Sequence, residues 1–403
     1  AEAALAELAR FMRGDPHNHL SLAADYAGCG LFPEAIEVAG RAVDAARSGS
    51  VPGPNFDSES GARGVYPMLH YALAYLYDRI GQAENAAAHR LAGRAAPSDY
   101  GFPNSSFDLL VLEAAVAAEP EDDKAHYYLG NWLYDKKRHD EAIAHWERSR
   151  AIRDDFATAH RNLALAYYNK RGDAEAALAA LEKAFSCDEE DARVFYELDQ
   201  LRKKLGHSPE SRLSELSGRL HLVKQRDDLY VEYVALLNLQ GACREAVRAL
   251  ADRRFHPWEG GEGKVTGQYV HAHVELGKQA LAEGRFGEAE EWLAKALTYP
   301  DNLGEGKLAG AQENHVHYYL GCAYEGLGDR DRANRSWSLA SQGLEEPASA
   351  MFYNDQPPEM IFYQGLAWDK LGNDREAKRR FNKLIDYAEK HLFDDVKMDY
   401  FAV

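Results

Sequence analysis

The feature that most constrains this 403-residue chain is a pattern of small and large side chains that returns at fixed intervals. Gly130, Gly277 and Gly321 each follow a Leu, and an Ala stands twelve positions after each glycine. Four positions after that Ala comes a large residue. Units of this length cannot bury a core alone, so a chain built from them stacks them into an elongated array.

These offsets define a 34-residue frame. A large residue stands at position 7, Gly or Ala at 8, often Gly at 15, Ala at 20 and a large residue at 24. We expect positions 8 and 20 to face each other where two helices cross, because small side chains let helix backbones approach. Gly at position 15 can adopt the left-handed conformation that ends the first helix. Weaker copies of the frame place position 8 at Ala23, Ala74, Ala164 and Gly365, and the segment 191–221 is degenerate but still helical in pattern.

The frame resembles that of tetratricopeptide repeats (TPR), and the resemblance covers most of the chain. It implies an all-α fold, namely a TPR-type helix-pair solenoid that winds as a right-handed superhelix of about nine to ten helix pairs. It also implies an interaction scaffold that binds a protein or a peptide.

The distance between successive positions 8 divides the chain. It is 34 or 35 residues from Gly130 to Val234, and 43 or 44 residues from Val234 to Gly365. We therefore expect three parts: irregular helix pairs at 1–122, regular pairs at 123–253 and long-period pairs at 254–403.

The extra residues of the long-period part fall into three connections, at 256–267, 299–314 and 345–360. In a solenoid, equivalent connections emerge on the same edge, so the three should lie side by side. They contain aromatic and amide side chains that disordered linkers rarely hold, so we expect them to be ordered and mutually packed. The candidate partner- or ligand-binding residues on this loop edge are Trp258, Glu259, Glu262, Lys264, Asn302, Glu305, Asn314, Phe352, Asn354, Gln356 and Glu359.

The segments HPWEGGEGKVTGQY, NLGEGKLAGAQENHVHYYLGCAY and MFYNDQPPEMIFYQGLAW carry a second resemblance. They are similar to the TPR region of large bacterial proteins with an uncharacterised galactose-mutarotase-like β-sandwich upstream. The resemblance implies a bacterial protein linked to carbohydrate metabolism. The sequence itself contains no β-rich segment. The chain starts without Met and ends on an apolar run, as a fragment of a longer protein would.

Two interpretations of the loop edge remain open. Its carboxylates could form the acid pair of a glycosidase, or they could cap helices. Trp258 and Phe352 could form a sugar-stacking platform with the neighbouring amides, or the core of a packed loop cluster. We assign no catalytic residue.

Three HxH pairs, at His17/His19, His271/His273 and His315/His317, are unsuited to holding one metal ion. Helical residues two apart point about 200° away from each other. No phosphate-binding loop and no nucleophile elbow is present, so we expect no metal and no cofactor. The four cysteines lie far apart, which favours reduced, buried thiols in a cytoplasmic protein.

Charge and hydropathy limit the partners. The net charge is −18, and the densest basic cluster, Lys378-Arg379-Arg380, is expected to be a solvated helix face. We therefore expect no nucleic acid as partner. No run approaches the roughly 20 apolar residues of a membrane helix, so no membrane partner is expected. Partners that remain are a protein or peptide, a neighbouring domain of the same polypeptide, a carbohydrate, and a second copy in a homo-oligomer.

Overall fold

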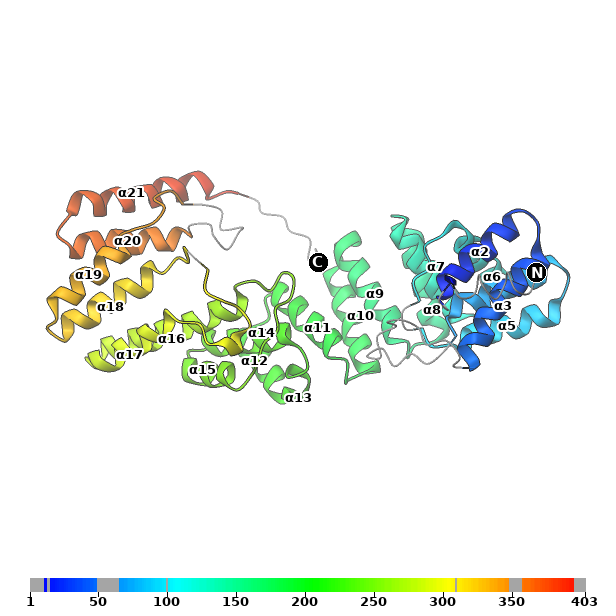
Figure 1. Ribbon diagram of the computed structural model, residues 1–403, viewed down its shortest axis with the longest axis horizontal. Helices are drawn as coiled ribbons and strands as arrows, with labels where there is room; N and C mark the ends of the chain where they lie inside the picture. Colours follow the sequence, from blue (N-terminus) through cyan, green and yellow to red (C-terminus); the bar gives the residue numbers. More distant parts are fainter. Residues whose placement is uncertain are drawn as a thin grey trace. The chain divides into compact units, whose positions relative to one another are not determined.

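The computed structural model describes residues 11–12, 15–48, 65–98, 101–308, 310–347 and 357–394. All regular secondary structure within these residues is helical (Figure 1). The contacts between residues divide the chain into two compact units, Ala1–Glu189 and Glu190–Val403. The three-part division by repeat spacing stays a prediction.

The first unit is a row of helix pairs, each joined by a tight turn. The pairs are α2–α3, α4–α5, α7–α8 and α9–α10, while α6 is single and packs on α4 and α7. The bounds are α2 (Pro16–Gly28), α3 (Phe32–Ser48), α4 (Pro67–Arg79), α5 (Ala83–Ala95), α6 (Ser106–Ala118), α7 (Asp123–Asp135), α8 (His139–Ile152), α9 (Ala157–Ala166), the π-helical turn η1 (Tyr167–Arg171) and α10 (Ala174–Cys187).

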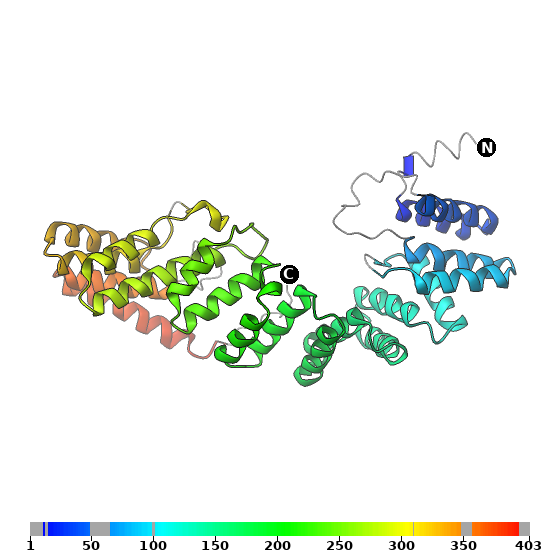
Figure 2. The ribbon, with the colours of Figure 1, turned by 90° about the horizontal axis from the view of Figure 1, so that it is seen from below.

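The second unit continues the same arrangement with α11–α12, α14–α15, α16–α17, α18–α19 and α20–α21. Figure 2 shows successive pairs lying side by side within each unit. The all-α helix-pair solenoid is thereby confirmed, and the degenerate segment forms α11, α12 and the short α13. The bounds are α11 (Ala192–Lys204), α12 (Pro209–Gly218), α13 (Leu220–Val223), α14 (Asp227–Leu239), α15 (Cys243–Ala251), α16 (Lys264–Ala282), α17 (Phe286–Ala296), the 3-10 turn η2 (Asp301–Leu303), α18 (Asn314–Gly326), α19 (Arg330–Ala340), α20 (Pro358–Lys370) and α21 (Asp374–His391).

The small residue at position 8 packs against position 24 of the second helix. A Cβ built on Gly321 would lie 2.3 Å from Nε1 of Trp337, and one on Gly130 would lie 2.4 Å from Nε1 of Trp146. Trp146 and Trp337 occupy position 24, not position 20. The glycine is needed because the ring at position 24 of the second helix packs directly against it.

The turn inside each pair depends on position 15. Gly30, Gly81 and Gly328 have φ of 77°, 76° and 79°, which is the left-handed region that favours glycine. Gly206 of the degenerate pair α11–α12 has φ 77°, so this pair uses the same turn. Lys137 at the end of α7 has φ 64° and is the non-glycine residue at this position with positive φ.

Two further expectations concern cysteines and membranes. All four cysteines are free, but only Cys243 is buried, while Cys29 at the end of α2 is exposed. The expectation of uniformly buried thiols is therefore wrong, since Cys29 caps a helix end at the surface. Among the described residues, no helix combines the length and the hydropathy needed to cross a membrane.

Candidate functional site

The first two long connections of the second unit are bonded to each other through Asn302. Its side-chain Nδ2 donates to the carbonyl oxygens of Leu250 and Arg253, both at 2.8 Å. Its own carbonyl accepts a hydrogen bond of 2.8 Å from the amide of Phe255. Carbonyls at the end of a helix have no partner within the helix, so Asn302 satisfies the end of α15 from the following connection.

Glu305 does the corresponding work at the start of α16. Its carboxylate accepts hydrogen bonds from the amide of Gly263, at 3.1 and 3.0 Å, and from Oγ1 of Thr266 at 3.1 Å. A carboxylate at a helix N-terminus is favourable because the free amides carry partial positive charge. The neighbouring Gly304 has φ +78° and lies so close to the carbonyl of Phe255 that an added Cβ would be 2.7 Å from that oxygen. Over their described residues, the first two connections therefore pack against each other.

Asn314, the first residue of α18, makes a similar contact within its own helix pair. Its Nδ2 donates to the carbonyls of Ala340 and Gln342, at 2.8 and 2.7 Å, and so satisfies the end of α19. Gln364 of α20 donates to the carbonyls of Gln342 and Leu344, at 3.2 and 2.9 Å. Buried amides therefore hold the start of the third connection in place.

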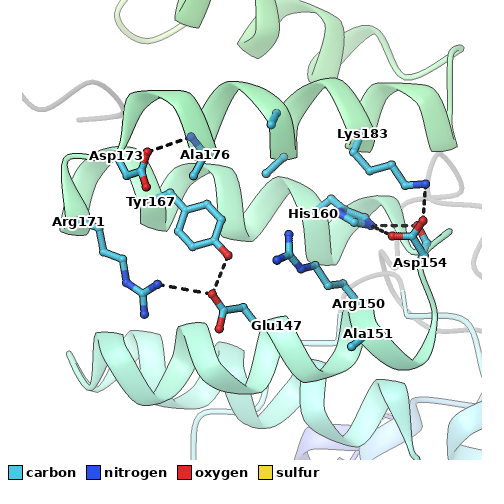
Figure 3. Close-up of a pocket in the computed structure, with 12 residues that line it drawn as sticks. Glu147, Arg150, Ala151, Asp154, His160, Tyr167, Arg171, Asp173, Ala176 and Lys183 are labelled. Atoms are coloured by element: carbon cyan, nitrogen blue, oxygen red, sulfur yellow. Dashed lines mark hydrogen bonds and ion pairs between the residues drawn. The ribbon is translucent and has the colours of Figure 1, made fainter.

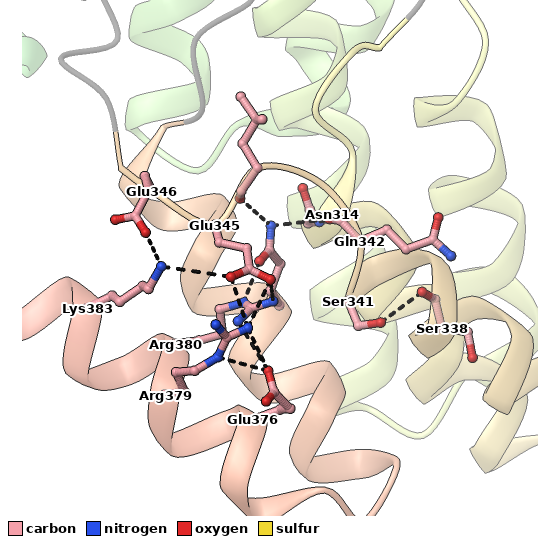
Figure 4. Close-up of polar contacts among 12 residues, drawn as sticks. Asn314, Ser338, Ser341, Gln342, Glu345, Glu346, Glu376, Arg379, Arg380 and Lys383 are labelled. Atoms are coloured by element: carbon pink, nitrogen blue, oxygen red, sulfur yellow. Dashed lines mark hydrogen bonds and ion pairs between the residues drawn. The ribbon is translucent and has the colours of Figure 1, made fainter.

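A cluster of charges holds the same connection against α21 (Figure 4). Arg380 is only 3% exposed, and its guanidinium donates to Gln364 Oε1 at 2.9 Å and to Glu345 Oε1 at 2.7 Å. Arg379 donates to the same Glu345 at 2.9 Å, and Lys383 pairs with Glu346. The expectation that Lys378-Arg379-Arg380 is wholly a solvated face is therefore wrong for Arg380, whose charge is matched by a carboxylate brought by the connection.

Of the other predicted residues of the loop edge, those that the structure describes are exposed or half-buried. Trp258 is half-buried, and its ring covers Gly261, where a Cβ would lie 2.1 Å from Cε2. Glu259, Glu262 and Lys264 are exposed. Glu359 is exposed in the first turn of α20. Phe352, Asn354 and Gln356 lie outside the described residues. The structure thus uses Asn302, Glu305 and Asn314 as internal braces, and a binding role for the edge stays a prediction.

The sequence analysis missed a recurring histidine. Position 4, four residues before position 8, is a histidine in six pairs: His19, His70, His126, His160, His273 and His317. This histidine could have been predicted from its recurrence at position 4 of the frame, because the HxH spacing alone does not reveal it. Within HxH, the buried His19 and His273 alternate with the exposed His17 and His271, as helix geometry requires.

Two of the position-4 histidines contact the turn that precedes their helix. Nε2 of His126 lies 3.2 Å from the carbonyl oxygen of Pro120, and Nε2 of His160 lies 2.9 Å from that of Asp154, so each ring ties the preceding turn to its helix. Burial lowers the pKa of both rings. Within the described residues, no group of three or more His, Cys, Asp or Glu is arranged to hold a metal ion.

Comparison with known proteins agrees with this architecture. Residues 130–170 match the family model described as TPR repeat, and residues 359–390 match the one described as tetratricopeptide repeat. The chain therefore carries tetratricopeptide repeats, and it is a TPR-type solenoid.

Solved structures similar to this chain include three TPR proteins. YrrB, described as a TPR protein with an unusual peptide-binding site, is 16% identical over 57% of this chain and 90% of its own, with a TM-score of 0.31. A tetratricopeptide repeat protein from Parabacteroides merdae is 14% identical over 75% of this chain and 99% of its own, with a TM-score of 0.33. The TPR domain of P58(IPK) is 14% identical over 94% of this chain and 100% of its own, with a TM-score of 0.26. At these values the likeness carries no argument about what this chain binds.

Proposed function

We propose that this chain is a docking scaffold for a protein or peptide, and that the loop edge of the second unit is its docking surface. Tetratricopeptide repeats at 130–170 and 359–390 support the general role. The observation that carries the choice of surface is the bracing of the connections by Asn302 and Glu305, which bond to helix ends 42 to 52 residues away in sequence. A surface that is ordered before binding loses less conformational entropy when a partner docks.

The braced edge offers the chemistry of an interaction surface. Trp258 presents part of its ring, and Glu259, Glu262 and Lys264 are exposed near it in sequence. An aromatic residue surrounded by polar groups is typical of the residues that contribute most to binding between proteins. The partner is a separate protein or peptide, a neighbouring domain of the same polypeptide, or a second copy of the chain. The resemblance of this half to bacterial proteins with an upstream galactose-mutarotase-like sandwich favours that sandwich as the neighbouring domain. The widely separated cysteines favour a cytoplasmic location for the protein.

The test uses a photo-crosslinking amino acid at two exposed positions of the second unit, in the cell that makes the protein. At position 259, on the loop edge, we expect a specific crosslinked product. At position 378, exposed on α21, we expect none. In a binding assay with the crosslinked partner, Trp258→Ala should weaken binding about thirtyfold or more, as for a central aromatic contact, and Lys378→Ala should leave it unchanged. Equal crosslinking at both positions would show that the edge is not the docking surface.

A second function follows from the same half-buried Trp258, because it stands beside the exposed carboxylate of Glu259. An aromatic ring next to an acid suits a carbohydrate, and this edge would then contribute to a carbohydrate-binding or glycoside-active site. The purified chain should be screened against glycosides and glucans. Turnover that is lost in Glu259→Gln or Glu305→Gln would favour this function over docking.

A further inference from the structure

Two helix pairs of the first unit are each joined by two histidines. In α4–α5, Nδ1 of His70 lies 2.9 Å from Nδ1 of His89, and in α7–α8 the same distance joins His126 and His145. In both helix pairs the two rings stand at positions 4 and 23 of the frame, 19 residues apart. The first ring is buried and the second is half-buried, so water competes little for the contact. Each contact ties the first helix of its pair to the second.

A contact between two imidazole nitrogens requires one N–H and one lone pair. Nε2 of His126 lies 3.2 Å from the carbonyl oxygen of Pro120, which can only accept, so Nε2 carries the hydrogen of this ring. Nδ1 of His126 is therefore the acceptor, and Nδ1–H of His145 is the donor. His70 and His89 must divide the two roles in the same way, whichever of them donates.

Acid changes the two rings one after the other. A first proton can bind Nε2 of His145, because the charged ring still donates through its Nδ1. A second proton must bind the accepting Nδ1 of His126. Both nitrogens would then carry hydrogen, so the hydrogen bond is lost and two like charges face each other. The closed helix pair therefore holds at most one extra proton, whereas two unfolded histidines take up two protons near pH 6.5.

The groups around His70 and His89 oppose positive charge. Burial, then His89 and Arg47 of α3, lower the pKa of His70 to about 4. Burial and then Arg47 lower the pKa of His89. The ring of Tyr77 stacks on His89 with centroids 5.5 Å apart. The charged group that acts on both rings is thus a cation.

The surroundings of His126 and His145 are mixed. Burial lowers the pKa of both rings, and the charge of His126 lowers that of His145 further. The charged groups near the two rings lie on α6, on α8 and in the turn before α7: they are the cations Arg138 and Arg148 and the carboxylates Glu113, Glu121, Asp122 and Glu141. The carboxylates favour a first proton, but no group can enter between two nitrogens 2.9 Å apart when the second one binds.

The next helix pair, α9–α10, has one histidine instead of two. The turn η1 adds one residue, so position 23 lies 20 residues after His160 and is Ala180. Nε2 of His160 lies 2.9 Å from the carbonyl oxygen of Asp154 and 3.4 Å from its Oδ1 (Figure 3). Burial lowers the pKa of His160, Asp154 raises it, and Arg150 and Lys183 lower it. A proton on this ring gains a carboxylate and meets no second ring.

We propose that His70/His89 and His126/His145 form an acid-sensitive latch. At neutral pH each N–H···N bond holds α4 to α5 or α7 to α8, and each of these helix pairs opens locally once both of its rings are charged. The open form binds more protons than the closed one. The closed form is therefore fully favoured above pH 6.5, and for each extra proton the open population rises up to about tenfold per pH unit below it. Acid would thus loosen one part of the scaffold, independently of the loop edge in the second unit.

The experiment measures hydrogen exchange of the full chain by mass spectrometry at pH 7 and pH 5, with exchange times corrected for the chemical effect of pH. Local opening sets the protection of backbone amides. One extra proton at 1.5 units below pH 6.5 allows a loss of up to about thirtyfold. We expect α4–α5 and α7–α8 to lose protection at least tenfold and α9–α10 less than threefold. An equal loss in all three helix pairs, or no loss in the first two, would overturn the proposal.

Two reciprocal variants assign the effect to the rings. His145→Gln keeps a side-chain N–H for His126 but cannot become charged, so α7–α8 should stay protected at pH 5 while α4–α5 still opens. His89→Gln should give the opposite result. His139→Gln is the matched control, since His139 lies on the same helix α8 but contacts the ring of Tyr134, and it should leave the tenfold loss unchanged. A loss that persists in His145→Gln, or disappears in His139→Gln, would contradict the latch.

Nitrogen-15 NMR of the imidazole rings tests the latch in the unaltered chain. At pH 7 we expect hydrogen on Nε2 of His126 and on Nδ1 of His145. As the pH falls, the second charge on this pair should appear together with the loss of protection in α7–α8. Two charged rings in a helix pair that stays protected would overturn the proposal.

Discussion

Two helix pairs of the second unit solve the same packing problem in opposite ways. In α18–α19, Trp337 is 3% exposed and its ring sits on Gly321. In α11–α12, position 8 is Asp199, which is 4% exposed and bonded to the 5% exposed Arg212, with Nε–Oδ1 at 2.9 Å and Nη2–Oδ2 at 2.6 Å. The crossing of two helices therefore requires matched surfaces rather than a small residue.

The two arrangements differ in the number of helix pairs that they connect. The ring of Trp337 fills its place within one pair. Arg212 also donates to Glu232 of α14 at 2.7 Å, so its charge links two pairs. A buried ion pair is stabilising only while both partners are present, because the remaining charge is left in a poorly solvating interior. The predictions below test this difference.

The largest effect is expected for Arg212→Leu. It leaves Asp199 buried without its partner and should lower the free energy of unfolding by about 3–5 kcal/mol. Urea unfolding followed by circular dichroism measures the loss. Arg248→Leu at an exposed position of α15 is the control and should cost less than about 1 kcal/mol. The double variant Asp199→Ala with Arg212→Leu should recover part of the loss, and a double variant worse than the single one would contradict the account.

Gly321→Ala tests the aromatic solution. The new Cβ would lie 2.3 Å from Nε1 of Trp337, so the ring must move, and we expect a loss of about 1–3 kcal/mol. Gly287→Ala in α17 is the control, because nothing lies within 4 Å of its Cβ. That control should stabilise the helix by about 0.5–1 kcal/mol. If both substitutions had the same sign, the ring would not be what requires glycine at position 8.

Acid should affect α18–α19 through its histidines. Burial, and then the nearby His271, His317 and Lys278, lower the pKa of His315 to about 4, and burial lowers the pKa of His317. Unfolded histidines take up protons near pH 6.5, before the folded ones do, so stability is full above that pH and falls from there towards pH 4.

The matching variant for this prediction comes from the other pair. Position 4 of α11 is Phe195, which is 1% exposed and cannot titrate. His317→Phe should therefore reduce the drop in melting temperature between pH 7 and pH 5, measured by calorimetry. An unchanged drop would show that His317 does not carry acid sensitivity.

The smallest effect concerns what both pairs share, the left-handed turn at Gly206 and Gly328. Lys137 holds the same conformation in the first unit, with φ 64°. Lys137→Gly should raise the free energy of unfolding by about 1 kcal/mol, since a side chain strains this conformation. Lys136→Gly, one residue earlier at φ −80°, should lower it. Stabilisation by both would contradict the turn as the cause.

The sequence predicts those parts of the fold in which a single position requires one particular type of residue. Gly at position 15 predicts the left-handed turn and Ala at position 20 predicts the helix crossing, because no other residue suits these places equally well. The burial of Asp199 at position 8 could not be predicted in this way, because it depends on the ion pair with Arg212. No position of the repeat frame indicates that arginine.

The candidate site was predictable only as a location. Spacing placed Asn302 and Asn314 on the loop edge, yet an amide that braces a backbone and an amide that binds a ligand look alike in sequence. Their partners, Leu250 and Ala340, lie 52 and 26 residues away.

The hydrogen bonds from Asn302 to the preceding helix pair have a mechanical consequence. In a simple repeat array, pulling on the ends can peel off one repeat after another, because each touches only its neighbours through helix faces. Here the connection that follows α17 is fastened to the end of α15 in the preceding pair. Stretched in optical tweezers, α14–α15 and α16–α17 should yield together in a single rip, so that this stretch of the chain transmits tension as a block.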